Sequence, residues 1–215
     1  MTTRMCRLGM GTLTHIPIPR CHNMHELPAA ATERARVQDL LSRGGQLTLE
    51  AEIQTLSKHL LHGLAYTVGS ALGSDPPTRK ECLSAFTTSA TNTGLMAGAK
   101  AWSKHAHRSG DAKSEGDRMG WWGGQPKGPV ASINERALVL FDKVMDKVTW
   151  RNLHWLPHQM LVYEVRVEEG YGMRWSQDRS QLVGDEGGSV DTTPWMFRGF
   201  VEPMMENGHE VGWTH

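Results

Sequence analysis

The sequence predicts an α+β fold in which N-terminal helices pack on a small C-terminal sheet of three antiparallel strands. Apolar residues recur at helical spacing between residues 48 and 148, and they alternate with polar residues between residues 160 and 203. Helices come first and strands last, which argues against a parallel sheet built from βαβ units. We expect three or four helices to cover one face of the sheet.

The chain has 215 residues, which is enough for one sizeable core. We expect a single α+β domain over residues 31–215. Residues 1–30 contain three prolines and many small side chains, which predict an extended N-terminal arm. The arginines of this arm and its lack of acidic residues before Glu26 weakly resemble an organellar targeting segment. Pro17 and Pro19 interrupt any amphipathic helix there, so a cytoplasmic location is the expectation.

The first helices follow from their caps and apolar stripes. Residues 32–42 favour a short helix that ends before a Gly-Gly pair. Thr48 is a good N-cap, and the apolar stripe from Leu49 to Val68 predicts a second helix that runs to about Leu72.

A capping box formed by Thr78 and Glu81 predicts the start of the next helix. Residues 87–94 are mostly small, which predicts close packing or a kink in its middle. The second half has one apolar and one basic face, and it continues to about Arg108.

Ser132 with Glu135 predicts another capping box, and the apolar stripe of this last helix continues to Val148. The connection before it, residues 109–129, contains Trp121 and Trp122 next to glycines. Paired tryptophans are unfavourable in a free linker, so we expect this segment to fold over a site as a lid or wall.

Three segments have the period-two alternation of half-buried strands: residues 160–168, 171–176 and 195–202. Their polar positions carry several arginines and glutamates. This polar face is either an ordinary solvated surface or an arginine-lined site for an anion or a carboxylate.

The loop between the first two strands determines their register. A three-residue loop ending at Tyr171 would place Val165 opposite Trp175 and keep the apolar faces together. It would also place Arg166 beside Arg174, which is unfavourable unless a carboxylate or a bound anion lies between them.

Composition excludes some classes of function. The 23 lysines and arginines balance 23 aspartates and glutamates, and this neutrality argues against nucleic acid as a partner. No apolar run approaches the roughly 20 residues that span a bilayer, so we expect a soluble protein without a membrane partner. The 3 cysteines lack CxxC spacing, which argues against a disulfide framework or a zinc ribbon. The 8 tryptophans and 11 histidines predict a Trp-filled core or an aromatic-walled pocket.

Local motifs for familiar chemistry are missing: HExxH, GxSxG and GxGxxG do not occur. Histidine remains as the group that exchanges a proton near neutral pH. We expect His105 or His154 to transfer the proton, with Glu164 or Glu202 to orient it. Cationic, amide and aromatic side chains are expected to bind the substrate: Lys104, Arg108, Trp121, Trp122, Asn152, Arg174, Trp175 and Arg198.

These residues predict a small enzyme that acts on an anionic small molecule by His-assisted acid/base chemistry, without an organic cofactor. One alternative is a non-catalytic module that binds a small molecule or a partner in the same pocket. A second alternative is a metal-dependent enzyme, in which a divalent metal would be held by His105, His154 and His209.

Sequence motifs over roughly residues 90–215 resemble a small family of uncharacterised proteins. The similar motifs are Ala99–His105 with His107–Arg108, Trp121–Gly123, Asn152 with His154, Tyr163–Arg166, Gly170–Trp175, Phe197–Pro203, Gly208–His209 and Gly212–Trp213. The resemblance implies a candidate site but brings no activity, cofactor or substrate. The segment around 181–193 departs from the pattern as an insertion, and the N-terminal arm lies outside it.

Overall fold

The computed structural model describes residues 15–42, 54–89, 94–106, 120–180 and 193–204. In these ranges the chain forms five helices and four strands, and the predicted α+β class is confirmed. The elements are α1 (Pro28–Ser42), α3 (Thr55–Leu61), α4 (Arg79–Thr87), α5 (Ala97–His105), α6 (Val130–Met145), β1 (Trp150–Leu156), β2 (Met160–Arg166), β3 (Gly172–Asp178) and β4 (Met196–Val201).

The sheet is a meander in the order β1-β2-β3-β4, with every neighbouring pair antiparallel. The prediction of three strands was therefore wrong by one, because β1 was expected to be a connection. In β1 the two tryptophans point to opposite faces of the sheet, and Arg151 and Asn152 are polar neighbours in sequence. Apolar and polar residues therefore do not alternate strictly, and the period-two signal is weak in this strand.

The register between β2 and β3 differs by two residues from the expected one. Val165 lies opposite Met173, Arg166 lies opposite Gly172, and Glu164 lies directly opposite Arg174. A shift of two residues leaves every side chain on its face, so the apolar pattern cannot distinguish these registers. The observed pairing replaces a repulsive Arg–Arg neighbour with an attractive Glu–Arg neighbour.

Three helix predictions were wrong. The helix expected from Thr78 to about Arg108 is two helices among the described residues, since α4 ends at Thr87 and α5 begins at Ala97. Of the helix expected from Thr48 to Leu72, the structure describes α3, which ends at Leu61, and Gly63 then turns the chain with a φ of 70°. The first helix begins at Pro28 rather than at residue 32, so residues 28–30 are helical instead of extended.

The expected capping boxes had different outcomes. The box of α4 is confirmed, since the Thr78 hydroxyl accepts from the Glu81 amide and the Glu81 carboxylate accepts from the Thr78 amide. The box expected at Ser132 is wrong, because α6 begins at Val130, directly after Pro129, without a side-chain cap.

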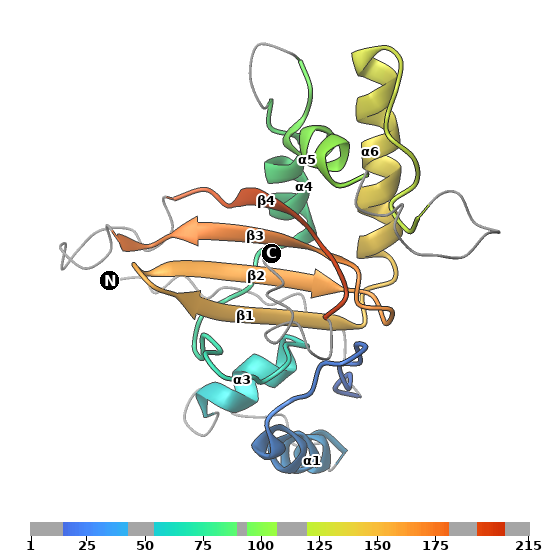
Figure 1. The fold of residues 1–215 in the computed structure, drawn as a ribbon. Coiled ribbons are helices and arrows are strands. Elements are labelled where there is room, and N and C mark those ends of the chain that lie inside the picture. Colours follow the sequence, from blue (N-terminus) through green and yellow to red (C-terminus); the bar gives the residue numbers. More distant parts are fainter. Residues whose placement is uncertain (1–14, 43–53, 90–93, 107–119, 181–192, 205–215) are drawn as a thin grey trace, which may run out of the picture.

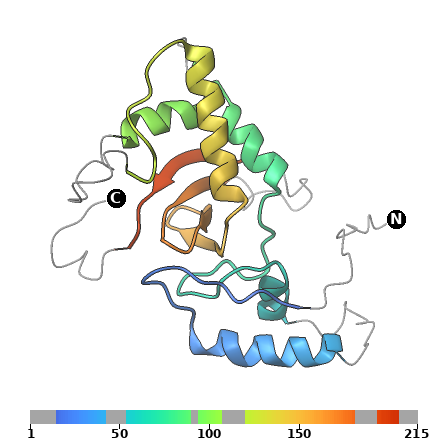
Figure 2. The same cartoon turned by 90° about the vertical axis from the view of Figure 1, so that its right-hand side faces the viewer.

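Helices α4, α5 and α6 cover one face of the sheet, while α1 and α3 lie beyond its β1 edge (Figure 1). Figure 2 shows the same division after a quarter turn. The main core lies between α4, α5 and α6 on one side and the sheet on the other. Trp175 is fully buried there, and its Nε1 donates to the Cys82 carbonyl of α4 over 3.1 Å.

The outer edge of β1 is covered by residues 65–71. The Ala65 amide donates to the Arg151 carbonyl over 2.7 Å, and the Ala71 amide donates to the Leu153 carbonyl over 2.8 Å. The Trp155 amide in turn donates to the Gly69 carbonyl over 3.0 Å. This segment therefore takes up backbone groups that an edge strand would otherwise leave unpaired.

Candidate functional site

Polar residues that are paired across neighbouring strands lie in a row on the face of the sheet opposite the main core. Asn152, Glu164, Arg174 and Gly199 follow one another across the four strands. His154 lies two residues further along β1, on the same face. The structure thus brings together four residues that the sequence nominated separately: Asn152, His154, Glu164 and Arg174.

Glu164 is the centre of this group, and each of its carboxylate oxygens binds a different arginine. Oε1 accepts from Arg166 Nε over 2.6 Å, and Oε2 accepts from Arg174 Nε over 2.8 Å and from Nη2 over 2.6 Å. Burial alone would raise the pKa of Glu164, but the charges and hydrogen bonds of the two arginines outweigh it and lower the pKa below the ordinary value of 4.5. Glu164 is therefore ionised near neutral pH.

The two arginines differ in burial and in the hydrogen-bond donors that remain unpaired. Arg166 is buried, and its Nη1 donates to the carbonyls of Gly170 and Glu202 over 2.6 and 2.7 Å. The Arg174 side chain is 29% exposed, and its Nη1 has no hydrogen-bond partner among the described residues. Arg166 therefore holds the sheet together, whereas Arg174 can bind an anion while Glu164 fixes its other side.

His154 lies beside this ion-pair group in a half-buried position. Burial lowers its pKa below the ordinary value of 6.5, and the nearby Arg174 charge lowers it further while Glu164 opposes the shift. Its ring is therefore mostly neutral at pH 7 and able to accept a proton.

Two buried polar atoms at this site have no hydrogen-bond partner among the described residues, namely Asn152 Oδ1 and His154 Nδ1. The Asn152 amide nitrogen is engaged, because it donates to the Thr67 hydroxyl over 3.0 Å. Unpaired buried polar atoms are rare and often mark sites that a ligand or water completes.

A second group of nominated residues lies at the other edge of the sheet. His105, at the end of α5, has its Nδ1 3.6 Å from Glu202 Oε1. The same oxygen accepts from Trp122 Nε1 over 2.9 Å, and the Trp122 carbonyl accepts from Trp102 Nε1 over 2.9 Å. Two buried tryptophans thus fix the carboxylate that faces His105.

The remaining nominated residues are dispersed. Lys104 and Arg198 are exposed, on α5 and β4. Trp175 was expected in a pocket wall, but it is part of the core. Trp121 stacks on Tyr171 with ring centroids 4.8 Å apart, and Lys143 Nζ lies 3.7 Å from its ring centroid. Arg108 and His209 lie outside the described residues.

Arg166 was not nominated as a site residue, although the alternation of β2 places it on the same face as Glu164. Its position in the expected register beside Arg174 was the signal that could have found it. The direct pairing of Glu164 with both arginines depends on the observed register.

The described residues contain no group of three or more His, Cys, Asp or Glu side chains that could hold a metal ion. His105 and His154 do not come together, since one lies at the β4 edge and the other on β1. Three strand spacings amount to roughly 14 Å, too far for ligands of one ion. Among the described helices none is long and apolar enough to cross a membrane.

Residues 85–184 match the family model of the CdiA C-terminal tRNase toxin domain. This segment contains α5, α6 and the first three strands in full, and with them His105, His154, Glu164 and Arg174. Neither the curated proteins nor the solved structures gave a match.

This match corrects the function expected from the sequence. An enzyme or binding module for an anionic small molecule was the wrong class, and the argument from neutral charge against nucleic acid was wrong as well. The net charge of a chain does not describe the local charge of one surface. Over residues 85–184 the chain is similar to a toxin domain that acts on tRNA.

Proposed function

We propose that the chain is a ribonuclease that cleaves tRNA at the polar face of its sheet. The similarity of residues 85–184 to a tRNase toxin domain carries the proposal. The geometry of Glu164, Arg174 and His154 supports it, because all three lie within the similar segment and on one face.

Cleavage of RNA through its own 2′-hydroxyl needs a base for that hydroxyl and a cation for the phosphate. His154 is suited to be the base, since its lowered pKa keeps the ring neutral at pH 7. Arg174 is suited to bind the phosphate with Nη1, while Glu164 holds Nε and Nη2. Glu164 is then a positioning residue, because its oxygens are occupied by the two arginines.

In this reaction the 2′-oxygen attacks phosphorus, and His154 takes the proton of the 2′-hydroxyl. The bond from phosphorus to the 5′-oxygen breaks, and that oxygen leaves with a proton from an acid or from water. The products are one fragment with a 2′,3′-cyclic phosphate and one with a 5′-hydroxyl.

His105 is a second candidate for proton transfer. Its Nδ1 lies 3.6 Å from Glu202 Oε1 and has no hydrogen-bond partner among the described residues. His105 is at the end of α5, which covers the core face of the sheet, whereas Arg174 and His154 lie on the opposite face, so we assign it no step in the cleavage of the same phosphate.

The test is cleavage of purified tRNA by the chain and by His154→Ala. We expect cleavage by the parent, and a rate at least about 100-fold lower in the variant, since general base catalysis contributes 10²–10⁴-fold. The matched control is His158→Asn, an exposed histidine of the same hairpin with a φ of 62°, which asparagine tolerates.

Two results would overturn parts of this proposal. Intact tRNA after incubation with the parent chain would reject the ribonuclease function. Cleavage that leaves 5′-phosphate ends, identified by mass spectrometry of the fragments, would reject His154 as the base for a 2′-hydroxyl while leaving a nuclease.

A further inference from the structure

We propose that the polar face of the sheet binds a nucleobase at the end where β1 and β2 are joined, and that this base carries an exocyclic amino group. Three side chains form the base subsite: Leu156, Met160 and Asp178. The inference rests on the proposed ribonuclease function. It adds a preference for one class of nucleotide next to the cleaved bond, which the cleavage chemistry itself does not require.

The strand registers bring the three side chains of the base subsite together on one face. Leu156 lies opposite Met160 in the pair of β1 and β2, and Met160 lies opposite Asp178 in the pair of β2 and β3. Side chains of residues paired in this way share a face and lie about 5 Å apart at Cβ. Leu156 follows His154 by two residues, so the base subsite is on the face of His154 and roughly 7 Å further along β1.

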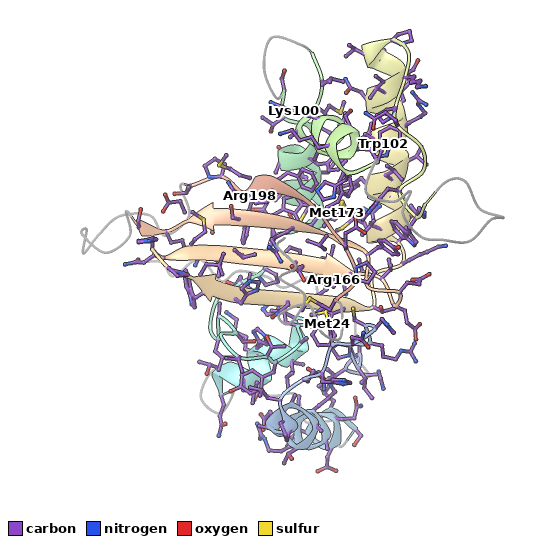
Figure 3. The ribbon with its side chains drawn as sticks, in the orientation of Figure 1. Met24, Lys100, Trp102, Arg166, Met173 and Arg198 are labelled. Atoms are coloured by element: carbon purple, nitrogen blue, oxygen red, sulfur yellow. The ribbon has the colours of Figure 1, made fainter. Side chains whose placement is uncertain are left out.

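The base subsite and the phosphate-binding arginine follow one another along β3. Asp178 comes four residues after Arg174, so both side chains are on the same face. Met160 begins β2, whereas Arg166, labelled in Figure 3, ends that strand at the far side of the sheet. A phosphate on Arg174 and a base at Asp178 can therefore belong to the same nucleotide or to neighbouring nucleotides.

Leu156 and Met160 give the base subsite an apolar surface that solvent reaches. Leu156 is 45% exposed, and Met160 is half-buried. Exposed apolar side chains that adjoin a polar site are suited to a ligand with an apolar face. Nucleobases have such a face, and enzymes that act on unstacked nucleotides hold them between aromatic or apolar side chains.

Asp178 favours a base over a phosphate at this place. Its side chain is exposed, and hydrogen bonds from Ser180 lower its pKa below the ordinary value of 3.8, so the carboxylate is ionised near neutral pH. The neighbouring Arg179 does not pair with it, because Arg179 Nε donates to Gln177 over 2.8 Å. An ionised carboxylate repels phosphate and accepts hydrogen bonds without donating any. It therefore suits an N–H group of a base.

The experiment compares cytosine with uracil, which have rings of the same size. Cytosine presents the amino group N4, a donor that Asp and Glu side chains accept from, where uracil presents the acceptor O4. The substrates are transcripts of the cleaved tRNA with either base on each side of the cleaved bond, and kcat/KM is measured for each with the full chain. We expect cytosine to be preferred about 5-fold or more at one of the two positions, the low end of discrimination by contacts with bases.

Two variants with matched controls test the side chains. Asp178→Asn should bring the ratio close to 1, because an amide donates to O4 of uracil as well as accepting from N4 of cytosine. Glu169→Gln, an exposed carboxylate in the turn after β2, should keep the ratio of the parent. Leu156→Ala should lower kcat/KM for both bases about 5-fold through lost packing, whereas Val139→Ala, exposed on α6, should change neither.

Three results would overturn the base subsite: equal kcat/KM for cytosine and uracil at both positions in the parent, a cytosine preference that survives in Asp178→Asn, or an unchanged kcat/KM in Leu156→Ala. In each case the parent still cleaves tRNA, so only this inference fails. If the parent cleaves no tRNA, the proposed function fails and the base subsite with it.

Discussion

Glu164 binds Arg166 and Arg174 with separate oxygens while almost fully buried, so its charge is necessary to the folded sheet. Glu164→Gln would leave the guanidinium of Arg166 buried without an ionic partner. Breaking a buried ion pair typically lowers the free energy of unfolding by about 3–5 kcal/mol. Urea denaturation measures this change.

A matched comparison is Arg79→Gln, which removes an exposed ion pair with Asp142 and Asp146. Exposed pairs contribute about 0–1 kcal/mol, so this variant should unfold at nearly the urea concentration of the parent. Equal decreases in the free energy of unfolding for Glu164→Gln and Arg79→Gln would contradict the expectation that the buried charge of Glu164 stabilises the sheet.

His154 sets the expected pH dependence of tRNA cleavage. Its pKa is lowered first by burial, so the neutral ring persists below the ordinary value of 6.5. We expect kcat/KM for tRNA to stay level as the pH falls from 7.5 to 6.5 and to decline only at more acidic pH. A rate that already halves above pH 6.5 would argue against His154 as the base.

At the scale of elements, α5 meets α4 at Gly98, where a side chain would overlap the buried ring of Phe86. Gly98→Ala should therefore force Phe86 to move, which costs about 1–3 kcal/mol in a packed core. Thermal unfolding of the variant should occur several degrees below that of the parent. An unchanged melting temperature would show that α4 and α5 can move apart to admit the extra methyl group without loss of stability.

The elements that were predicted well from the sequence have apolar residues that recur with a single clear period. β2 and β3 have apolar side chains at every second position, such as Tyr163 and Val165, and α6 buries Ala137, Phe141 and Val144 at spacings of four and three. The helix expected up to Leu72 failed because apolar spacing alone does not require a helix. Val68 belongs to that stripe, yet it is 85% exposed in the loop beside β1.

The candidate site was predictable in its residue types and less so in its grouping. Period two placed Glu164 and Arg174 on one face, but their direct pairing depends on a register that the pattern leaves open. The separation of His105 from His154 depends on the missed strand β1 and on the docking of α5 at β4. Both are long-range contacts, which local spacing does not encode.

For the whole molecule, histidines that are buried in their neutral form predict a stability that depends on pH. Burial lowers the pKa values of His59, His62 and His154 below 6.5. The unfolded chain therefore binds more protons than the folded chain as the pH falls through 6.5, and the free energy of unfolding decreases.

Urea denaturation between pH 7.5 and 5.5 measures this effect. His59→Gln should reduce the dependence on pH, because His59 is fully buried and its Nε2 lies 3.1 Å from the Ala65 carbonyl. A stability that is constant over this range would contradict the lowered pKa values.

The covering of β1 by residues 65–71 also limits how the molecule can associate with other polypeptides. Backbone groups at that edge already have partners, so a foreign strand has little to pair with there. Within the described part of the chain, β4 is the other end of the sheet. A polypeptide that enlarges the sheet by β-augmentation would have to join at β4, beside the end of α5.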